Sequence, residues 1–322
     1  MPRSQTYFRG LLVEPAPRQI QPRRIGRRVI ENSVNLVLVN PPSWAPQIAL
    51  KRILDRLWGY RTSRAFAHLR DGALVVHHDS GFFSNCSTIL LEIARSKEVV
   101  DTIDTRASFT HFSEGTSGNP WGEFFLDPIV PGGRDIIRWN RSRISRRLPH
   151  HSFYSLIDFR LAHEIIGRYF FPSQTIMDTV ENLQGQYALD LAKTAVLCVR
   201  GTDKATEVKP TSLARYIRKA RRLLRRHSSL MVWVQTDQRQ IRDQILSELG
   251  PRAFAIKALP VTEGTEVIHR SAEIANRAEF TRNLIAVVWL MSQAKFVITY
   301  TGNVGYWIAL FRGSTRRLTQ FR

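Results

Sequence analysis

Ala195-Val-Leu-Cys-Val-Arg-Gly-Thr-Asp-Lys204 is the stretch of this chain that decides its fold. Its first five residues are apolar without alternation, a pattern typical of a strand that is buried on both faces of a parallel sheet. The next five residues bring two cations, a carboxylate and a glycine to the carboxyl end of that strand. Open α/β sheets bind their ligands at this end. We therefore expect a ligand site immediately after Val199.

The side chains of this segment suit a phosphate group. Arg200 and Lys204 offer hydrogen-bond donors to phosphate oxygens. Gly201 lets the backbone come close to a ligand, and Asp203 can orient the two cations. The plainer interpretation is a polar turn that closes an ordinary strand.

Two later segments repeat the pattern of an apolar run with a polar end. Leu230-Met-Val-Trp-Val-Gln-Thr-Asp237 closes on Asp237, and Phe296-Val-Ile-Thr-Tyr-Thr-Gly-Asn303 closes on Thr301, Gly302 and Asn303. Amphipathic or apolar segments typical of helices lie between the strands, together with one more candidate strand. From about residue 194 onward we predict alternating strands and helices, with helices over 211–227, 238–249 and 282–294 and the additional strand over 253–257.

Three of these motifs resemble the donor-site motifs of the α1,6-fucosyltransferase superfamily in their order and spacing: Val199-Arg-Gly-Thr-Asp-Lys204, Gln235-Thr-Asp237 and Thr299-Tyr-Thr-Gly-Asn303. That superfamily includes the core fucosyltransferase of N-glycans and the rhizobial Nod-factor fucosyltransferases, and protein O-fucosyltransferases are its distant relatives. The similarity covers about residues 190–312. It implies an inverting, metal-independent glycosyltransferase of the two-domain GT-B type that uses GDP-fucose as donor.

The resemblance also implies roles at the predicted reaction centre. Arg200 matches the arginine that grips the donor diphosphate. Asp203 and Lys204 match the pair that organises the reaction. Glu207 matches the glutamate proposed as general base once one residue is deleted between it and the lysine. Asp237 matches the aspartate at the end of the second strand.

Further residues belong to the donor site by the same resemblance. Thr301, Gly302 and Asn303 occupy the loop whose backbone and hydroxyl groups touch phosphate. Gly201 and Thr202 lie within the arginine segment. Arg282 opens a second region of strong similarity. We expect all six to bind the donor.

Three positions depart from the family pattern. Cys198 stands where the family has histidine, and Gly201 stands where a second basic residue often follows the arginine. Val287 stands where an aspartate is thought to read the guanine. The donor therefore stays open between GDP-fucose and another nucleotide-sugar, and a degenerate relative that only binds glycans is a further alternative.

The chemistry can also be argued from the residues themselves. Displacing a nucleoside diphosphate from a sugar needs a base for the acceptor hydroxyl, and a carboxylate such as Glu207 or Asp203 beside a lysine could take that proton. Arg200 can hold the departing diphosphate through two parallel hydrogen bonds. Metal-dependent transferases usually show an Asp-x-Asp motif, which is absent from this sequence. We therefore expect no metal ion and no cofactor besides the donor substrate.

Composition bounds the class of protein. The chain has 322 residues, 43% of them hydrophobic, and a formal net charge of +20. This length fits two folded domains, and the charge favours anionic partners. A non-enzymatic nucleic-acid-binding protein is the alternative from another class, although no helix-turn-helix, zinc-finger or aromatic sheet motif supports it. We expect a nucleotide-sugar donor, an oligosaccharide or lipid-linked glycan acceptor, and no nucleic acid.

The predicted location is the cytoplasm. Cys86 and Cys198 are the only cysteines and are too far apart in sequence to indicate a disulfide framework or a zinc site. No apolar run has the length of a membrane span, and the first thirty residues lack the apolar core of a signal peptide. Peripheral association with an anionic membrane is compatible with the charge.

The predicted fold class is α/β and GT-B-like, with two Rossmann-type, doubly wound domains that face a cleft. Residues 1–30 are arginine-rich and predict a basic flexible tail. Residues 31–185 form the predicted acceptor-side α/β domain, and residues 186–322 form the predicted nucleotide-sugar-binding domain. Within the first domain we expect strands over 34–39, 73–78 and 98–104, and helices over 47–58 and 84–96.

Overall fold

The computed structural model describes residues 67–78, 80–96, 99–109, 111–115, 118–128, 154–201, 211–263 and 274–321. The chain divides into two units, Met1–Leu57 and Trp58–Arg322, and all described residues belong to the second unit. The predicted tail over 1–30, strand over 34–39 and helix over 47–58 lie outside the described residues. The boundary between residues 185 and 186 stays a prediction.

A small sheet of three strands forms the amino-terminal part of the described chain. β1 (Ala67–Arg70) runs antiparallel to β2 (Ala73–Val76) across a turn at Asp71-Gly72, a dipeptide typical of two-residue hairpins. Helix α3 (Phe82–Arg95) then crosses over to β3 (Thr102–Asp104), which is parallel to β2. The predicted helix and two strands of this region are confirmed with shifted bounds, whereas β1 was not predicted.

Helical segments link this sheet to the carboxyl-terminal half. Asp158 caps one of these helices, because its Oδ1 accepts a hydrogen bond from the amide of Leu161 at 3.2 Å. An antiparallel bridge between Phe125 and Pro172 joins the two ends of the region. The segments are α4 (Trp121–Phe124), η1 (Tyr154–Leu156), α6 (Phe159–Tyr169) and α7 (Gln174–Gln186).

The carboxyl-terminal half contains a five-stranded sheet in which all strands are parallel, in the order β6-β5-β4-β7-β8. Strand and helix alternate along this half, as predicted, so its α/β character with a parallel sheet is confirmed. The elements are η2 (Leu191–Lys193), β4 (Thr194–Val199), α8 (Leu213–Arg226), β5 (Met231–Thr236), α9 (Arg239–Leu249), η4 (Gly250–Arg252), β6 (Ala253–Phe254), α10 (Arg277–Gln293), β7 (Phe296–Tyr300), α11 (Asn303–Arg312) and β8 (Leu318–Phe321).

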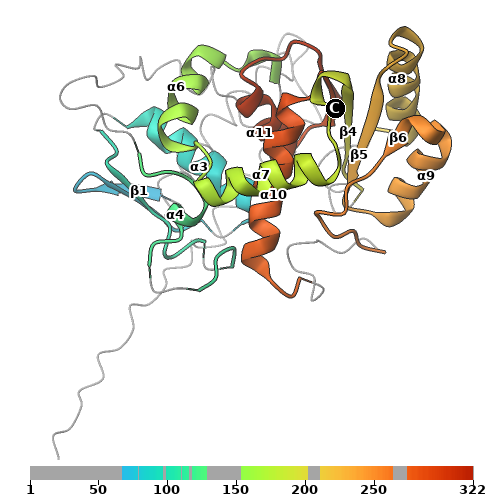
Figure 1. Cartoon of the computed structure of the whole chain (residues 1–322). Coiled ribbons are helices and arrows are strands. Elements are labelled where there is room, and N and C mark those ends of the chain that lie inside the picture. Colours follow the sequence, from blue (N-terminus) through green and yellow to red (C-terminus); the bar gives the residue numbers. More distant parts are fainter. Residues whose placement is uncertain are drawn as a thin grey trace, which may run out of the picture. The chain divides into compact units, whose positions relative to one another are not determined.

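Helices cover both faces of this sheet, which explains why β4 is apolar without alternation. Leu197 packs with α8 and α9 on one face, and Val196 packs with α10 and α11 on the other. In Figure 1, α8 and α9 lie on one side of β4 and β5, and α10 and α11 lie on the other. Every residue of β4 is buried. The strand therefore has no solvent-facing side to be made polar.

Some elements differ from the prediction in length or number. The strand predicted over 253–257 is only two residues long, and α10 begins at Arg277, five residues before the predicted start. Asn276 caps α10 by accepting from the amide of Glu279 at 2.9 Å. Strand β8 was not predicted, because it is a partly exposed edge strand without a clear apolar run.

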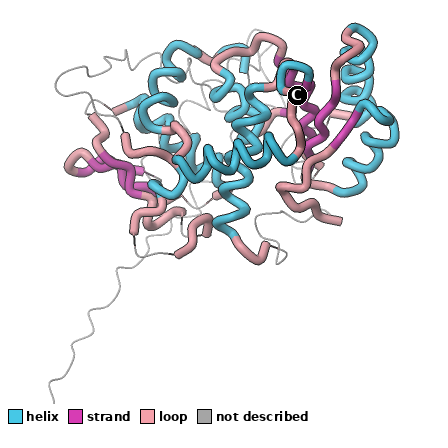
Figure 2. Tube along the Cα trace, viewed as in Figure 1, coloured by secondary structure: helices cyan, strands magenta, loops and turns pink. Residues whose placement is uncertain are grey.

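The strands of the two sheets form separate groups, as Figure 2 shows in magenta. One hydrophobic core cluster nevertheless includes side chains of the small sheet, α3, α6, α7, α10 and α11. Among the described residues, no helix combines the length and the apolar character needed to cross a membrane.

Arg252 forms hydrogen bonds with the backbone between the carboxyl end of α8 and the start of β5. Its guanidinium donates to three backbone carbonyls, at 2.6 Å to His227, 3.0 Å to Leu230 and 3.1 Å to Leu224. The carbonyl of Leu224 belongs to the last turn of α8 and those of His227 and Leu230 follow the helix, so none of the three has an intrahelical donor. Hydrogen bonds from a charged donor contribute more than neutral ones.

We expect Arg252→Met to lower the free energy of unfolding by about 2 kcal/mol, because the carbonyls of Leu224 and Leu230 lose this charged donor and that of His227 keeps only the amide of Leu230. Urea denaturation followed by circular dichroism measures the change. Arg70→Met is the matched control, since Arg70 and its ion-pair partner Asp71 are both mostly exposed and such pairs contribute little to stability. Equal effects of the two substitutions would contradict the role of Arg252.

Candidate functional site

Three predicted site segments follow three neighbouring strands of the parallel sheet. Arg200 and Gly201 come after β4, Asp237 comes after β5, and Thr301 to Asn303 come after β7. Because these strands are parallel neighbours, their carboxyl ends lie at one edge of the sheet. The chain order reverses between β4 and β7, and ligands of open α/β sheets bind in the crevice at such a reversal.

Asp237 holds the segment that follows β4. Its Oδ1 accepts a hydrogen bond from the amide of Gly201 at 2.7 Å, and its Oδ2 lies 3.9 Å from Nε of Arg200. The side chains of Arg200 and Asp237 are 23% and 20% exposed. One carboxylate therefore orients both the backbone and the guanidinium at the edge of the sheet, and the partial burial strengthens its attraction to the arginine.

Gly201 is closely surrounded. A Cβ atom at this position would collide with the side-chain amide of Gln238 and would lie 2.5 Å from Cδ1 of Ile241. A second basic residue, which the family often has here, would need these side chains to move.

The turn after β7 is held from both sides. Thr301 Oγ1 donates to the carbonyl of Phe321 at 3.1 Å and accepts from Nε2 of Gln320 at 2.9 Å. Asn303 begins α11, and its Oδ1 accepts from Ser87 Oγ on α3 at 3.3 Å. The first amides of a helix lack intrahelical acceptors and carry partial positive charge. The turn therefore ends in a helix terminus that suits an anion.

Cys198 lies in the core just before Arg200. Burial raises the pKa of its thiol to about 12, and the nearby Asp237 carboxylate acts in the same direction. The thiol is therefore protonated at neutral pH and is unsuited to act as a nucleophile. Cys86 is also buried and unpaired. Neither cysteine contributes an exposed thiolate.

Searches with this sequence and structure give matches among solved structures alone. No protein-family model matches the sequence, and no curated protein matches it. The structure is similar to that of the NodZ α-1,6-fucosyltransferase soaked with GDP-fucose, at 15% identity and a TM-score of 0.45, over 74% of this chain and 91% of that chain.

Two further structures show the range of the similarity. The fucosyltransferase NodZ from Bradyrhizobium matches at 15% identity and a TM-score of 0.45, over 76% of this chain and 92% of its own. The apo-form of POFUT1 matches at 12% identity and a TM-score of 0.33, over 51% and 49% of the two chains. The two NodZ structures are structures of fucosyltransferases.

Of the remaining predicted site residues, only Arg282 is among the described residues. Thr202, Asp203, Lys204 and Glu207 lie outside the described residues, so their roles stay predictions. Arg282 lies on α10, where its Nη1 donates to Oε1 of Glu114 at 2.8 Å. This contact joins α10 to the segment after β3 and not to the ends of β4 and β5.

Val287 also lies on α10 and is fully buried within the core cluster. At this position a carboxylate would be costly without a partner. Valine therefore suits this position, because this part of α10 packs in the apolar core.

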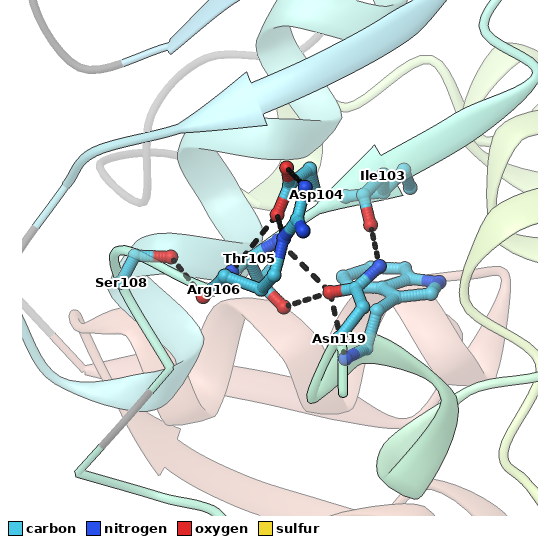
Figure 3. Close-up of polar contacts among 7 residues, drawn as sticks. Ile103, Asp104, Thr105, Arg106, Ser108 and Asn119 are labelled. Atoms are coloured by element: carbon cyan, nitrogen blue, oxygen red, sulfur yellow. Dashed lines mark hydrogen bonds and ion pairs between the residues drawn. The ribbon is translucent and has the colours of Figure 1, made fainter. Parts of the chain in front are cut away.

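A second polar cluster stands at the carboxyl end of β3. Asn119 accepts hydrogen bonds from the amide and hydroxyl of Thr105, both at 3.0 Å, and donates to the carbonyl of Ile103 at 2.6 Å (Figure 3). Arg106 donates to both carboxylate oxygens of Asp104 and lowers the pKa of that carboxyl. These bonds fix the loop after β3.

Sequence reasoning missed two residues that shape the site. Tyr154 and Ser87 contact the turn after β7 from positions 148 and 216 residues away along the chain. No local pattern marks either residue, because each acts through a contact that only folding creates. Among the described residues, no group of three or more His, Cys, Asp or Glu side chains is arranged to hold a metal ion. The expectation that no metal is needed stays a prediction.

Proposed function

We propose that this protein is a glycosyltransferase that binds a nucleoside-diphosphate sugar at the carboxyl edge of its five-stranded sheet. The observation that carries this proposal is the pairing of Arg200 with Asp237 at the carboxyl end of β4, next to β7, whose following turn begins α11 at the point where the strand order reverses. A guanidinium and helix amides together suit the charge of a diphosphate. The motif resemblance described above adds GDP-fucose as the specific donor.

The proposed reaction is an inverting transfer of fucose to a glycan hydroxyl. A carboxylate, Glu207 or Asp203, removes the proton of the acceptor hydroxyl, and the freed oxygen attacks the anomeric carbon of the sugar. The bond from that carbon to the diphosphate breaks, and the negative charge passes to the leaving GDP. Arg200 and Lys204 stabilise this charge, which removes the need for a metal ion. Thr202 and Arg282 are proposed to contact the donor.

The proposed architecture is the GT-B arrangement, in which residues 31–185 supply the acceptor side and residues 186–322 bind the donor. A glycan, free or linked to a lipid, is the proposed acceptor. The net charge of +20 supports an anionic partner such as the diphosphate or a lipid head group. The cytoplasm is the proposed location, with peripheral attachment to an anionic membrane.

A second candidate is transfer from a nucleotide-sugar with another base. It is supported by Val287, which is apolar and fully buried where the family has the aspartate thought to read guanine. In this candidate, the diphosphate contacts stay the same and only the recognition of the base differs.

A thermal-shift panel with GDP, UDP, ADP and CDP tests both candidates. A ligand present at a hundred times its Kd stabilises the folded state by about 2.7 kcal/mol, which raises Tm by several degrees. We expect GDP to give the largest shift, and release of GDP from GDP-fucose in the presence of acceptor glycans to follow. A larger shift with another nucleotide would favour the second candidate.

No shift with any nucleotide, combined with tight and strongly salt-dependent binding to DNA or RNA, would overturn the proposal. That result would favour the nucleic-acid-binding class instead, because such binding depends on the release of counterions from phosphates.

A further inference from the structure

We infer that Tyr154 is a positioning residue for the diphosphate site, an inference that rests on the proposed function. Tyr154 lies in η1, outside the five-stranded sheet, and is 1% exposed. Its hydroxyl donates toward the carbonyls of Tyr300 and Gly302, at 2.7 and 2.9 Å, and accepts from the amide of Gly302 at 3.1 Å. One phenol thus holds the backbone of the turn after β7 on both sides of Thr301.

A second residue completes this support. Gln320 on β8 accepts from the amide of Tyr154 at 3.0 Å through Oε1, and its Nε2 donates to Thr301 Oγ1 at 2.9 Å. Tyr154, Gln320 and Thr301 therefore form one connected network around the turn. We call these three side chains the turn bracket.

The turn bracket determines which backbone amides stay available to a ligand. The amide of Gly302 donates to the hydroxyl of Tyr154. The carbonyl of Gly302 also accepts a hydrogen bond from the amide of Tyr306 in the first turn of α11. The amides of Asn303, Val304 and Gly305 are the first three of α11 and have no intrahelical acceptor. The bracket fixes their direction before a ligand arrives, and a preorganised site avoids the entropic cost of ordering a loop on binding.

Burial keeps the phenol in the form that this role requires. It raises the pKa of Tyr154, so the hydroxyl stays protonated and its single hydrogen can be shared between the two carbonyls. Gly305 packs against the same oxygen, since a Cβ atom there would lie 2.6 Å from Tyr154 Oη. The hydroxyl therefore lies between Gly302 and the first turn of α11.

Tyr306 provides a matched control. It is buried like Tyr154, its ring lies 6.1 Å from that of Tyr154, and its hydroxyl has no hydrogen-bond partner among the described residues. Tyr154→Phe and Tyr306→Phe remove the same atom from neighbouring buried rings. Only the first substitution removes a group that holds the turn.

The experiment measures the Kd for GDP by calorimetry on the full chain, well below Tm, and the KM and kcat with GDP-fucose. We expect Tyr154→Phe to weaken GDP binding and raise the donor KM about tenfold, with a smaller change in kcat. Tyr306→Phe should match the unaltered protein. Equal affinity of Tyr154→Phe and the unaltered protein would overturn the inference, and so would equal losses in both variants.

If Tyr154→Phe does not fold, Gln320→Met takes its place, because it removes the other arm of the turn bracket. A similar loss of GDP affinity supports the inference, and an unchanged affinity overturns it. If the unaltered protein binds no nucleoside diphosphate, the proposed function itself fails. That result is distinct from a failure of the positioning role, in which the unaltered protein binds GDP and the variants bind it equally well.

Discussion

Replacing Arg200 with alanine should lower the turnover of the nucleotide-sugar donor by a hundredfold or more while the protein stays folded. The guanidinium lies beside Asp237 at the edge of the sheet, where it can meet the leaving diphosphate. Losing one well-placed donor to a developing charge costs about 10²–10³ in kcat. The measurement is the rate of GDP release from GDP-fucose, with circular dichroism to verify the fold.

Arg221→Ala is the control for this prediction. Arg221 lies on α8 and pairs with Glu248 at 2.6 Å, with about half of its side chain exposed. An exposed pair of this kind contributes little, so this variant should keep its activity. If Arg200→Ala keeps its turnover, or if turnover falls equally in both variants, the proposed role of Arg200 in binding the diphosphate is wrong.

Gly305→Ala should destabilise the protein by about 3 kcal/mol, even though alanine favours helices over glycine. The new Cβ atom would lie 2.6 Å from the backbone carbonyl oxygen of Tyr300, 2.6 Å from Tyr154 Oη and 2.8 Å from Thr299 Oγ1. Real Cβ contacts are longer than this, and a backbone atom of a buried strand end cannot move aside at low cost. Thermal and urea denaturation measure the loss.

Gly167→Ala is the same substitution without the collision. Gly167 is exposed in α6, and within the described part of the chain a Cβ atom there would meet nothing within 4 Å. The gain in helix propensity should raise the free energy of unfolding by about 0.5–1 kcal/mol. Opposite signs for the two variants support the close packing at Gly305. A stabilised Gly305→Ala would show that the turn is less tightly packed than the structure indicates.

The central strand β4 shows which structural features a local sequence pattern can predict. Residues 195–199 are apolar at every position because helices cover both faces of β4. The sequence pattern alone therefore indicates that this strand is buried on two sides. The edge strand β8 carries no such signal, because half-exposed residues at an edge are constrained by a single neighbouring strand. The two strands that the pattern missed, β1 and β8, both lie at a sheet edge.

The residues of the site also divide into those that a local sequence pattern predicts and those that it does not. Arg200, Asp237 and Thr301 could be predicted, because each follows an apolar run directly and parallel strands bring their carboxyl ends together. The partner of Arg282 could not be predicted, because Glu114 is 168 residues away and the ion pair depends on how α10 packs.

The sequence by itself determined the alternation of strands and helices in the carboxyl-terminal half and the edge of the sheet at which the polar residues gather. The physical reason is that burial and hydrogen bonding within a strand or helix act over a few residues. Only the tertiary structure decided that Tyr154 and Gln320 hold the turn after β7 and that Ser87 contacts Asn303. These contacts join segments whose separation along the chain leaves no local trace, since they arise only when the packed core brings the segments together.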